Sequence, residues 1–443
     1  MISSPGIGSG LDVNSIITKL MAVESQPLTQ LQQKQSDYKS QLSAVSQLKG
    51  ALSSFQTSMQ KLDATSDFQL FSATSSDSTV FTATADSTAS LGSHTVQVVR
   101  VAEHHQLAAS TAYADTTTAI GATGSIQLTV NGNQFSVTLD GKNLGQIASD
   151  INNASGNTGV SASIITDTSG NHLVLSANET GSTGFITVGY TGTDPFALQS
   201  LNQDRDGSGS FTAADLNAEV VVDSTFTANP TSNQVSSVIS GVTLNLAGTG
   251  TATLGVQRDT AKVQAQAQTF VDAYNNLHQT LMSLESGTLQ GDTTVLSIEN
   301  RIRSILNTPP SGISSSWSYL AEIGVSLQKD GTMALDATTF QSALTTDFSG
   351  VANLFGNDNQ GYAFRLQDAA NQLVQTGGPL DARTEGLNSR LDTVQSRIDD
   401  MTYRLTKIQA NYQKQYTALD TLMGTLQTTS TYLTQQLANL KLG

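Results

Sequence analysis

Hydrophobic residues recur at two different spacings along the chain, and the change between them divides it into three parts. Near both ends, apolar residues step by three and four, which is the spacing of one face of a helix. Between about residues 68 and 256 they alternate by two, with Gly, Asn and Asp between the runs, as is typical of strands joined by turns. The pattern predicts terminal helices and a β-rich middle.

The N-terminal stripe is long and narrow. Asp12 is a candidate N-cap for a first helix, and Pro27 interrupts the helical pattern because proline is not tolerated inside a helix. Beyond Pro27 the stripe continues with Gln35 at one seam position and one shift of phase, a pattern of the coiled-coil kind. Its members include Leu28, Leu31, Tyr38, Leu42, Val45, Leu48, Leu52, Phe55, Met59 and Leu62.

The C-terminal stripe is more regular and is interrupted at Gln415 and Thr429. Its members are Leu391, Val394, Ile398, Met401, Leu405, Ile408, Tyr412, Leu419, Leu422, Leu426 and Leu433. So narrow a stripe does not stabilise a lone helix in water, so we expect a partner helix. The pattern leaves open whether that partner is the other end of the same chain or another copy of it.

Turn residues in the middle of the chain predict individual hairpins. Asn131-Gly132 separates two alternating runs between Ile126 and Leu139, and Asn-Gly supplies the positive φ of a primed turn. A second hairpin is expected between Val160 and Leu175. We also expect the run Val242–Leu246 to pair with Leu254 and Val256 across Ala-Gly-Thr-Gly-Thr. Helical spacing returns at about Asp259, and a further hairpin is predicted between Val325 and Leu335.

These elements predict an α+β multidomain protein in which both ends return to one helical region and the β-rich middle projects from it. The expected parts are a flexible segment and coiled-coil helix (1–70), one β-rich domain in two pieces (71–110 and 201–258), a nested outer β-rich domain (111–200), a helical domain with a β-hairpin (259–385) and a C-terminal coiled coil (386–443).

Composition excludes several classes of function. The net charge of −15 disfavours nucleic acid and anionic membrane surfaces, because a basic stripe is needed to displace their counterions. The chain has no cysteine, which excludes disulfides and thiolate chemistry. No apolar run reaches the roughly 18 residues of a spanning helix, and the start lacks the pattern of a cleaved secretory signal. We therefore expect no membrane insertion.

No catalytic constellation is visible. Gly6, Gly8 and Gly10 suggest a phosphate loop, but too few residues precede them for a buried strand and Leu11 stands where the third glycine belongs. His104 and His105 could attract a metal, yet adjacent strand residues point to opposite faces. Neither H-E-x-x-H nor G-x-S-x-G occurs. We expect a protein that is not an enzyme and requires no cofactor.

One stretch fits the twelve-residue EF-hand calcium loop. Acids fall at positions 1, 3 and 12, a hydroxyl at 5, a glycine at 6, a backbone carbonyl at 7 and an aromatic ring at the apolar position 8. Serine replaces the usual Asp/Asn at position 5 and aspartate the usual Glu at 12, so any affinity should be weak, with Kd about 10⁻⁴–10⁻³ M. The alternative is a polar turn between strands. The candidate Ca²⁺ ligands are Asp204, Asp206, Ser208, Ser210 and Asp215.

Several motifs together resemble one family, the flagellar filament cap proteins, also called FliD or hook-associated protein 2. The opening GIGSGLD followed by ESQPL is similar to the N-terminal signature of that family. The resemblance continues through ISGVTLNL, FVDAYN, LQGD, DGTMALD, VANLF and the C-terminal YQKQYTALDTLM. It covers essentially the whole chain. The acidic loop at 204–215 departs from the family pattern, so its calcium role is not part of what the resemblance implies.

The resemblance implies a homo-oligomeric cap at the distal tip of the bacterial flagellar filament, exported unfolded through the flagellum's own type III channel. The glycines at the start would then form a mobile lead-in to the first helix. The cap would retain exported flagellin and promote its folding and insertion, with helical domains as legs and β domains as a plate. Five copies are the expected number, and other numbers stay open.

Further partners implied by the resemblance are flagellin, the hook–filament junction proteins and a cytoplasmic export chaperone at the C-terminal helix. The residues expected to form assembly seams are Leu42, Leu52, Phe55, Leu391, Val394, Ile398, Leu405 and Ile408. Two alternatives remain: another flagellar axial protein, which would also pair its terminal helices, and a surface adhesin that binds through its β modules.

Overall fold

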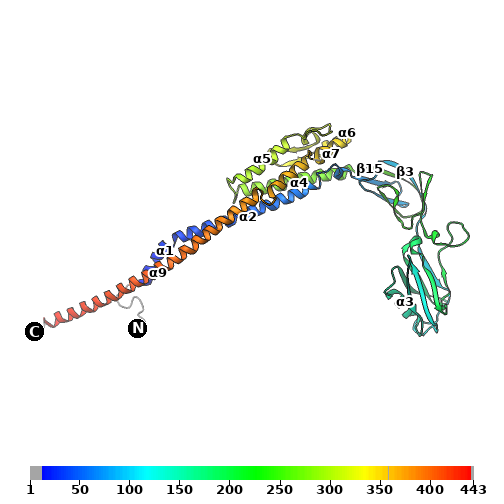
Figure 1. The fold of residues 1–443 in the computed structure, drawn as a ribbon, viewed down its shortest axis with the longest axis horizontal. Helices are drawn as coiled ribbons and strands as arrows, with labels where there is room; N and C mark the ends of the chain where they lie inside the picture. The colour runs from blue at the N-terminus through cyan, green and yellow to red at the C-terminus, as the bar shows by residue number, and fades with distance from the viewer. Residues whose placement is uncertain (1–11, 358, 441–443) are drawn as a thin grey trace. The chain divides into compact units, whose positions relative to one another are not determined.

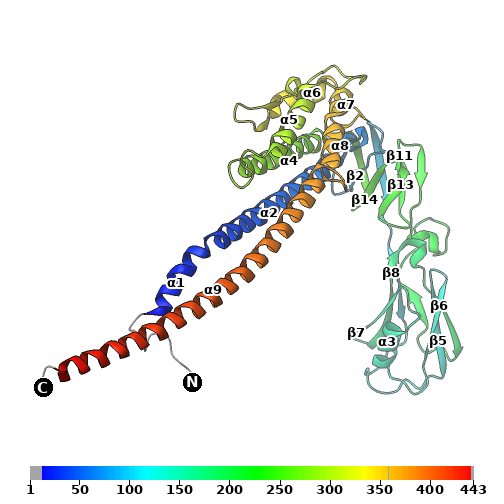
Figure 2. The same ribbon diagram turned by 60° about the vertical axis from the view of Figure 1, so that its left-hand side comes forward.

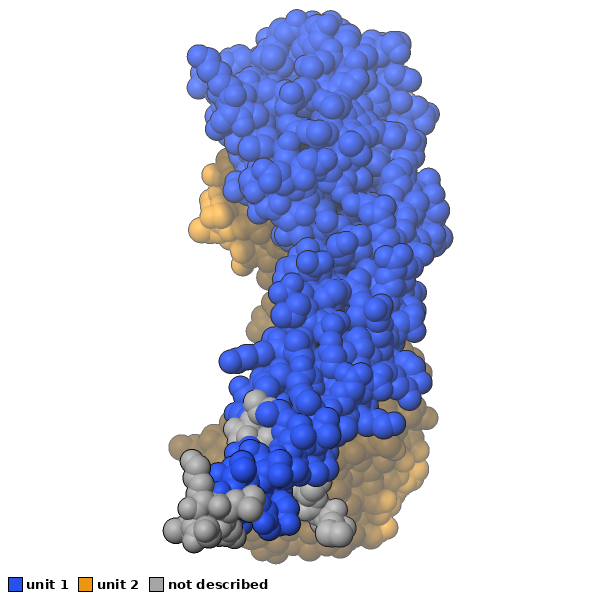
Figure 3. Space-filling model, turned by 90° about the vertical axis from the view of Figure 1, so that its left-hand side faces the viewer, with its two compact units in different colours: residues 1–68, 264–443 blue, residues 69–263 orange. Residues whose placement is uncertain are grey.

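The computed structural model describes residues 12–357 and 359–440, so the glycines at 6, 8 and 10 lie outside the described residues. The chain forms two compact units, which Figure 3 colours separately. The first, unit 1, contains residues 1–68 and 264–443, and the second, unit 2, contains residues 69–263. Each unit is described by itself below.

Three long helices in unit 1 come from the two ends of the chain. They are α1 (Val13–Glu24), α2 (Gln26–Gln60) and α9 (Pro379–Leu440). Asp12 caps α1 as expected, since its side chain accepts a hydrogen bond from the Ser15 N–H at 3.0 Å. Pro27 lies in the first turn of α2, where its missing N–H costs nothing, so the chain breaks only at Ser25. In both ribbon views α2 and then α1 run alongside α9 (Figures 1 and 2).

The rest of unit 1 packs shorter elements around a group of phenylalanines. Phe355 lies 5.2 Å from the rings of both Phe68 and Phe270 and 6.4 Å from Phe340, all fully buried. These four rings join four different elements, which fixes the core of the unit. The elements are η1 (Thr65–Phe68), α4 (Thr260–Glu285), α5 (Thr293–Asn307), η4 (Leu320–Ile323), β16 (Val325–Leu327), β17 (Met333–Leu335), α6 (Ala337–Thr346), α7 (Phe348–Gly356) and α8 (Tyr362–Val374).

Unit 2 contains two β modules, each with its own hydrophobic core. In the inner module, a five-stranded sheet of order β1-β15-β3-β11-β12 and a three-stranded sheet of order β13-β14-β2 share a core that includes Val98, Leu244 and Leu254. All pairings are antiparallel. The strands are β1 (Phe71–Ser75), β2 (Phe81–Ala85), β3 (Gly92–Arg100), β11 (Glu219–Val222), β12 (Phe226–Ala228), β13 (Gln234–Ile239), β14 (Val242–Leu246) and β15 (Gly250–Arg258).

The outer module combines sheets of order β10-β4-β8-β7 and β6-β5-β9 with one helix. The turn between β5 and β6 has φ of 47° at Asn131 and 74° at Gly132, as the Asn-Gly pair predicts. The elements are β4 (His104–Ala109), β5 (Gly124–Val130), β6 (Asn133–Thr138), α3 (Leu144–Asn153), β7 (Val160–Asp167), β8 (Gly170–Thr180), η2 (Gly181–Gly184), β9 (Thr187–Gly192) and β10 (Leu198–Ser200). A short helix, η3 (Ala213–Leu216), lies on the connection from β10 back to β11 of the inner module.

One expected hairpin is wrong. β14 and β15 do not pair with each other but belong to the two different sheets of the inner module. The connecting segment turns instead onto Val80, whose carbonyl accepts hydrogen bonds from the N–H groups of Ala247 and Gly248. Gly250, with φ of 150°, then starts β15 beside the Val80 side chain. The short polar link is therefore a crossing between sheets rather than a hairpin turn.

The expected fold class is confirmed: the terminal helices lie in one unit and the β-rich middle lies in the other. Among the residues that the structure describes, no helix is both long enough and apolar enough to cross a bilayer.

Candidate functional site

The first candidate surface is the apolar seam along α9 in unit 1. Leu52 and Phe55 on α2 are buried, as are Val394 and Leu405 on α9. Among the remaining predicted seam residues, Leu42, Leu391, Ile398 and Ile408 are half-buried. The two terminal stripes thus meet inside a single chain, and all eight predicted residues lie on helices α2 and α9.

Two side-chain hydrogen bonds also join the helices along this seam. Gln35, the polar residue that interrupts the N-terminal stripe, donates a hydrogen bond from its side-chain amide to Gln395 on α9. Further along, the Tyr412 hydroxyl donates to the Glu24 carboxylate at 3.2 Å, at the point where α1 ends. Because a misaligned polar group loses its partner, such pairs favour one register of the two helices.

From Leu419 onward the large apolar residues of the same stripe are exposed. Leu426 is 59% exposed and Leu437 is 64% exposed, although Leu405 on the same seam is buried. Asp420 is the only charged residue between Gln415 and Leu440, so this part of α9 offers apolar and uncharged polar side chains almost exclusively. We call this surface the tail stripe; its exposed large apolar residues are Leu419, Leu422, Met423, Leu426, Tyr432, Leu433 and Leu437.

The sequence left open whether the partner of the C-terminal helix comes from the same chain or from another copy, and the answer differs along α9. The first half of the α9 seam is covered by α2 and α1 of the same chain. Within residues 12–357 and 359–440, the large apolar side chains of the tail stripe stay exposed, although Asp420 between them is buried. Because an isolated apolar stripe in water is unfavourable, the tail stripe is the candidate surface for a second molecule.

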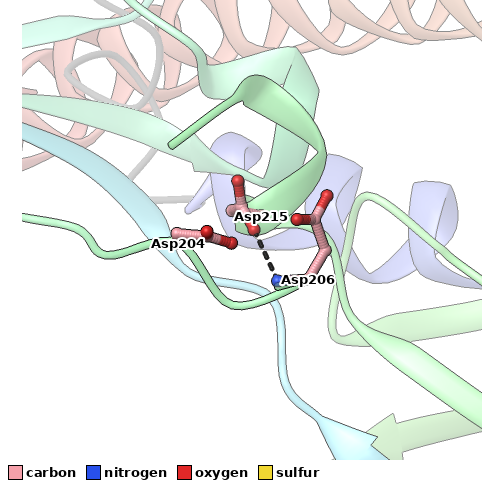
Figure 4. Close-up of side chains that lie close together, drawn as sticks. All are labelled: Asp204, Asp206 and Asp215. Atoms are coloured by element: carbon pink, nitrogen blue, oxygen red, sulfur yellow. Dashed lines mark hydrogen bonds between the residues drawn. The ribbon is translucent and has the colours of Figure 1, made fainter. Parts of the chain in front are cut away.

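The second candidate site is the acidic loop of unit 2, drawn in Figure 4. Asp204, Asp206 and Asp215 each offer a carboxylate oxygen, and these oxygens lie within 4.8 Å of one another. Two glycines in the loop explain why the three carboxylates come together. Gly207 and Gly209 have φ of 77° and 89°, left-handed conformations that bend the chain so that its first residues approach Asp215 in η3.

Asp215 organises the loop. It is fully buried, and its two carboxylate oxygens accept backbone hydrogen bonds from Arg205, Asp206 and Thr212 and one from the Thr212 hydroxyl, at 2.7–3.1 Å. Burial alone would raise the pKa of Asp215, but the backbone donors outweigh it and lower the pKa to about 2. The group is therefore a carboxylate at neutral pH.

The other predicted ligands take the following positions. Asp204 accepts the N–H groups of Gly207 and Gly209 at 2.9 and 2.6 Å, and the Ser208 hydroxyl donates to the Ser210 carbonyl at 3.0 Å. Asp206 is exposed and lines an open recess of about 710 Å³. A carboxylate has about four lone-pair positions, so Asp204, with two donors, and Asp206, with one, retain capacity for a cation. The four donors on Asp215 fill its positions, so Asp215 would have to exchange one of them to become a ligand. Hard oxygens arranged in this way suit Ca²⁺.

The two adjacent histidines behave as strand geometry predicts. His104 is exposed and His105 is buried, on opposite faces of β4, so they do not form a shared metal site. His105 instead stacks on Phe185 at 4.5 Å between ring centroids and lies 5.4 Å from Phe211, the aromatic residue of the acidic loop. Sequence reasoning missed this cluster, because nothing in the local pattern brings three such distant residues together.

Comparisons with known proteins match most of the chain to flagellar proteins. Family models for the flagellar hook-associated protein 2 N-terminus and C-terminus match residues 9–105 and 216–428, and a flagellin hook IN motif matches residues 125–179. The chain is 36% identical to flagellar hook-associated protein 2 of Escherichia coli K12, covering 99% of this chain and 98% of that protein. It is 32% identical to the B-type protein of Pseudomonas aeruginosa PAO1, over 99% and 98%.

A solved structure extends the likeness to three dimensions. The D1-D2-D3 domains of the flagellar cap protein FliD from Escherichia coli superpose with a TM-score of 0.64 at 31% identity, covering 78% of this chain and 99% of that one. The terminal helices and β-rich middle expected from the sequence motifs are the parts that these matches span. The chain belongs to the flagellar hook-associated protein 2 family of flagellar cap proteins.

Proposed function

We propose that this protein caps the distal end of the bacterial flagellar filament as a ring of identical copies, five being the expected number. The cap retains flagellin that arrives through the export channel and promotes its folding and insertion. Membership of the cap-protein family over 99% of the chain supports this assignment. The protein acts by binding and assembly rather than by catalysis.

The observation that carries the mechanism is the uncovered tail stripe on α9. A helix that presents Leu422, Leu426 and Leu433 to water is suited to bind other helices. Because the stripe is almost uncharged, its contacts rest on apolar burial and are not fixed by ion pairs. Weak contacts of this kind suit a leg that must release and rebind each time a flagellin subunit is added.

The same stripe is our proposed binding surface for the other partners. Before export it would be covered by a cytoplasmic chaperone, which would keep an apolar helix from aggregating. After export it would face the helices of flagellin and, at the first stage of growth, those of the hook–filament junction proteins. These partners would compete for one surface, so only one of them is bound at a time.

The experiment that tests the cap role measures flagellin in the culture medium of a strain that lacks this gene. We expect monomeric flagellin in the medium and no filaments, with both defects reversed when the gene is restored. Normal filaments in the deletion strain would overturn the proposal. In that case, binding of the isolated protein to host glycans or host proteins would favour an adhesin instead.

We propose calcium binding at the acidic loop as a second function, supported by the convergence of Asp204, Asp206 and Asp215. Together with the Ser208 hydroxyl and the Ser210 carbonyl, they would supply hard oxygen ligands from one loop. Calorimetric titration of the metal-free full chain with CaCl₂ tests the proposal. We expect one site with Kd of about 10⁻⁴–10⁻³ M that is lost in Asp204→Asn, whereas Asp167→Asn, which alters an aspartate of another turn, should bind normally. Absence of heat in the wild-type protein would reject the site.

A further inference from the structure

The two β modules of unit 2 are joined at a compact junction where the chain crosses between them. We define this junction as residues 101–105, 181–186 and 202–217. The Glu103 N–H donates to the Leu216 carbonyl, and the Gly181 N–H donates to the Glu103 carbonyl, both at 2.9 Å. The side chain of Asn233 in the inner module bonds to both backbone groups of Ala102, at 2.7 and 2.9 Å. The junction is therefore hydrogen-bonded to both β modules.

At the centre of this junction lies His105. Its side chain is 2% exposed and is stacked nearly parallel to Phe185, at 4.5 Å and 4° between ring planes. Phe211 approaches the same imidazole at 5.4 Å and also lies 6.1 Å from Phe185. Phe185 follows η2 of the outer module, and Phe211 comes from the acidic loop, where it fills the apolar position and contributes no ligand atom. The three rings therefore hold the loop against the outer module.

The hydrogen bonds of His105 define its protonation state. Its Nδ1 accepts the Ile186 N–H at 2.9 Å, so Nδ1 carries no proton and the neutral ring holds its proton on Nε2. Among the described residues, Nε2 has no hydrogen-bond partner although it is buried. A second proton could only be placed on Nδ1, where it would face the Ile186 N–H donor directly. Protonation therefore breaks this hydrogen bond and leaves a buried cation with no acceptor on either nitrogen.

We propose that the stack of His105, Phe185 and Phe211 is an acid-sensitive clamp, and that protonation of His105 releases the acidic loop from the outer module. The clamp is closed at neutral pH and opens as the medium becomes acidic. Opening exposes the imidazole to water, where the charged form is stable. It also frees Phe211, so the junction loosens while the separate cores of the two modules remain folded.

The charged groups around the clamp do not offer His105 a counter-ion within the part of the chain that the structure describes. Glu103, which directly precedes the strand, is paired with Arg205 at 3.1 Å, and the carboxylate of Asp215 is occupied by four donors from the loop. The Asp204 and Asp206 carboxylates accept N–H groups within their own loop. The other titratable groups on β4 and β8 are His104, His172 and Glu179. The faces of the two phenyl rings attract a cation, but this does not replace a lost hydrogen bond and full hydration.

The pH range of the release follows from linkage. Burial lowers the pKa of His105 to about 4, whereas an opened junction would give it the ordinary value of about 6.5. Between these two values the open form binds the additional proton, so opening becomes more favourable as pH falls. With these two pKa values the opening constant rises by about fiftyfold between pH 7 and pH 4.5.

Hydrogen exchange on the full chain tests the proposal. We expect the protection of the Ile186 amide, corrected for the intrinsic pH dependence of exchange, to fall by about fiftyfold from pH 7 to pH 4.5. The hairpin of β5 and β6 should keep its protection over this range. His105→Phe retains an aromatic ring but cannot be protonated, and it removes the acceptor of the Ile186 N–H, so this variant is followed at the Glu103 and Gly181 amides of the junction. These amides should lose protection in the wild type and keep it in His105→Phe. His104→Gln, at the exposed neighbour, should behave as the wild type does.

Either of two results would overturn the clamp. One is equal protection of Ile186 at both pH values in the wild-type chain. The other is the same loss in His105→Phe as in the wild type. Should His105→Phe fail to fold, an NMR titration of the wild-type imidazole decides the matter without a variant. A His105 resonance that titrates near pH 6.5 while Ile186 stays protected would reject the proposal.

Discussion

Tyr412 and Glu24 form a hydrogen bond of 3.2 Å between residues that are 388 positions apart in the chain. This bond to the carboxylate raises the pKa of the Tyr412 hydroxyl, which therefore remains a donor at physiological pH. It lies where α1 meets α2, so it ties the break in the N-terminal helices to the middle of α9. Further along α9, from Leu419 onward, the large apolar residues of the seam are exposed.

The covered and exposed parts of the seam should respond differently to truncation. Leu52→Ala removes a fully buried side chain and should lower the free energy of unfolding by about 2–5 kcal/mol. Leu426→Ala makes the same chemical change at an exposed position and should alter it by less than about 0.5 kcal/mol. Chemical denaturation followed by the fluorescence of the single Trp317, which lies in unit 1, measures both. Equal losses would show that Leu426 is covered in solution.

Assembly should depend on the tail stripe more than on overall stability. Leu426→Asp places a charge on the exposed stripe, so we expect it to weaken cap assembly while the circular dichroism of the monomer stays unchanged. Ile398→Asp, in the half-buried part, should weaken assembly and loosen the α2–α9 pair while leaving the β modules folded. Sedimentation velocity reports the oligomer size. Unchanged size in both variants, with native circular dichroism, would contradict the role of the seam.

Calcium should stabilise unit 2 in proportion to the affinity of the acidic loop. At 10 mM CaCl₂ and Kd of about 10⁻⁴–10⁻³ M, mass action predicts roughly 1–3 kcal/mol of added stability. Ser208→Asp adds a carboxylate at position 5 of the loop and should tighten binding, because ligand charge sets affinity in such loops. Differential scanning calorimetry with and without calcium measures this. Ser208→Asp that binds no better than the wild type would count against the assigned ligand positions.

The fold should lose stability in two separate pH ranges, one set by His105 and one by Asp215. His105 has a lowered folded-state pKa, so its neutral form stabilises the fold fully above about pH 6.5, and stability declines from there to about pH 4. Asp215 also has a lowered pKa, to about 2, so its contribution is present above the ordinary value near 3.8 and is lost between that value and about pH 2. His105→Phe should abolish only the upper range. Acid titration followed by near-ultraviolet circular dichroism separates the two, and an unchanged upper range in that variant would show that another group causes it.

Local signals predicted local structure well. Asn131-Gly132 dictated its turn because few residue pairs adopt two successive positive φ values, and Asp12 and Pro27 defined helix boundaries by their effect on backbone hydrogen bonds. The acidic loop was recognisable as a candidate site because its candidate ligands come from one short segment. In each case the residues that determine the local structure lie within a few positions of the turn, helix end or loop that they form.

Long-range pairing was harder to predict. The polar link between β14 and β15 looks like a hairpin turn, and only the position of Val80 on another part of the chain sends the two strands into different sheets. The periodicity of α9 continues past its interruptions at Gln415 and Thr429, so it does not indicate that α1 and α2 cover only its first part. His105, Phe185 and Phe211 each lie in ordinary-looking segments, and their stack exists only because the two β modules meet there.

The most direct test of the cap assignment is to locate the protein on intact flagella by immunogold electron microscopy. The account predicts label at the distal tip of each filament and none along its shaft. Label along the shaft or at its base would instead indicate another axial protein, and label spread over the cell surface would indicate an adhesin; either result would contradict a cap.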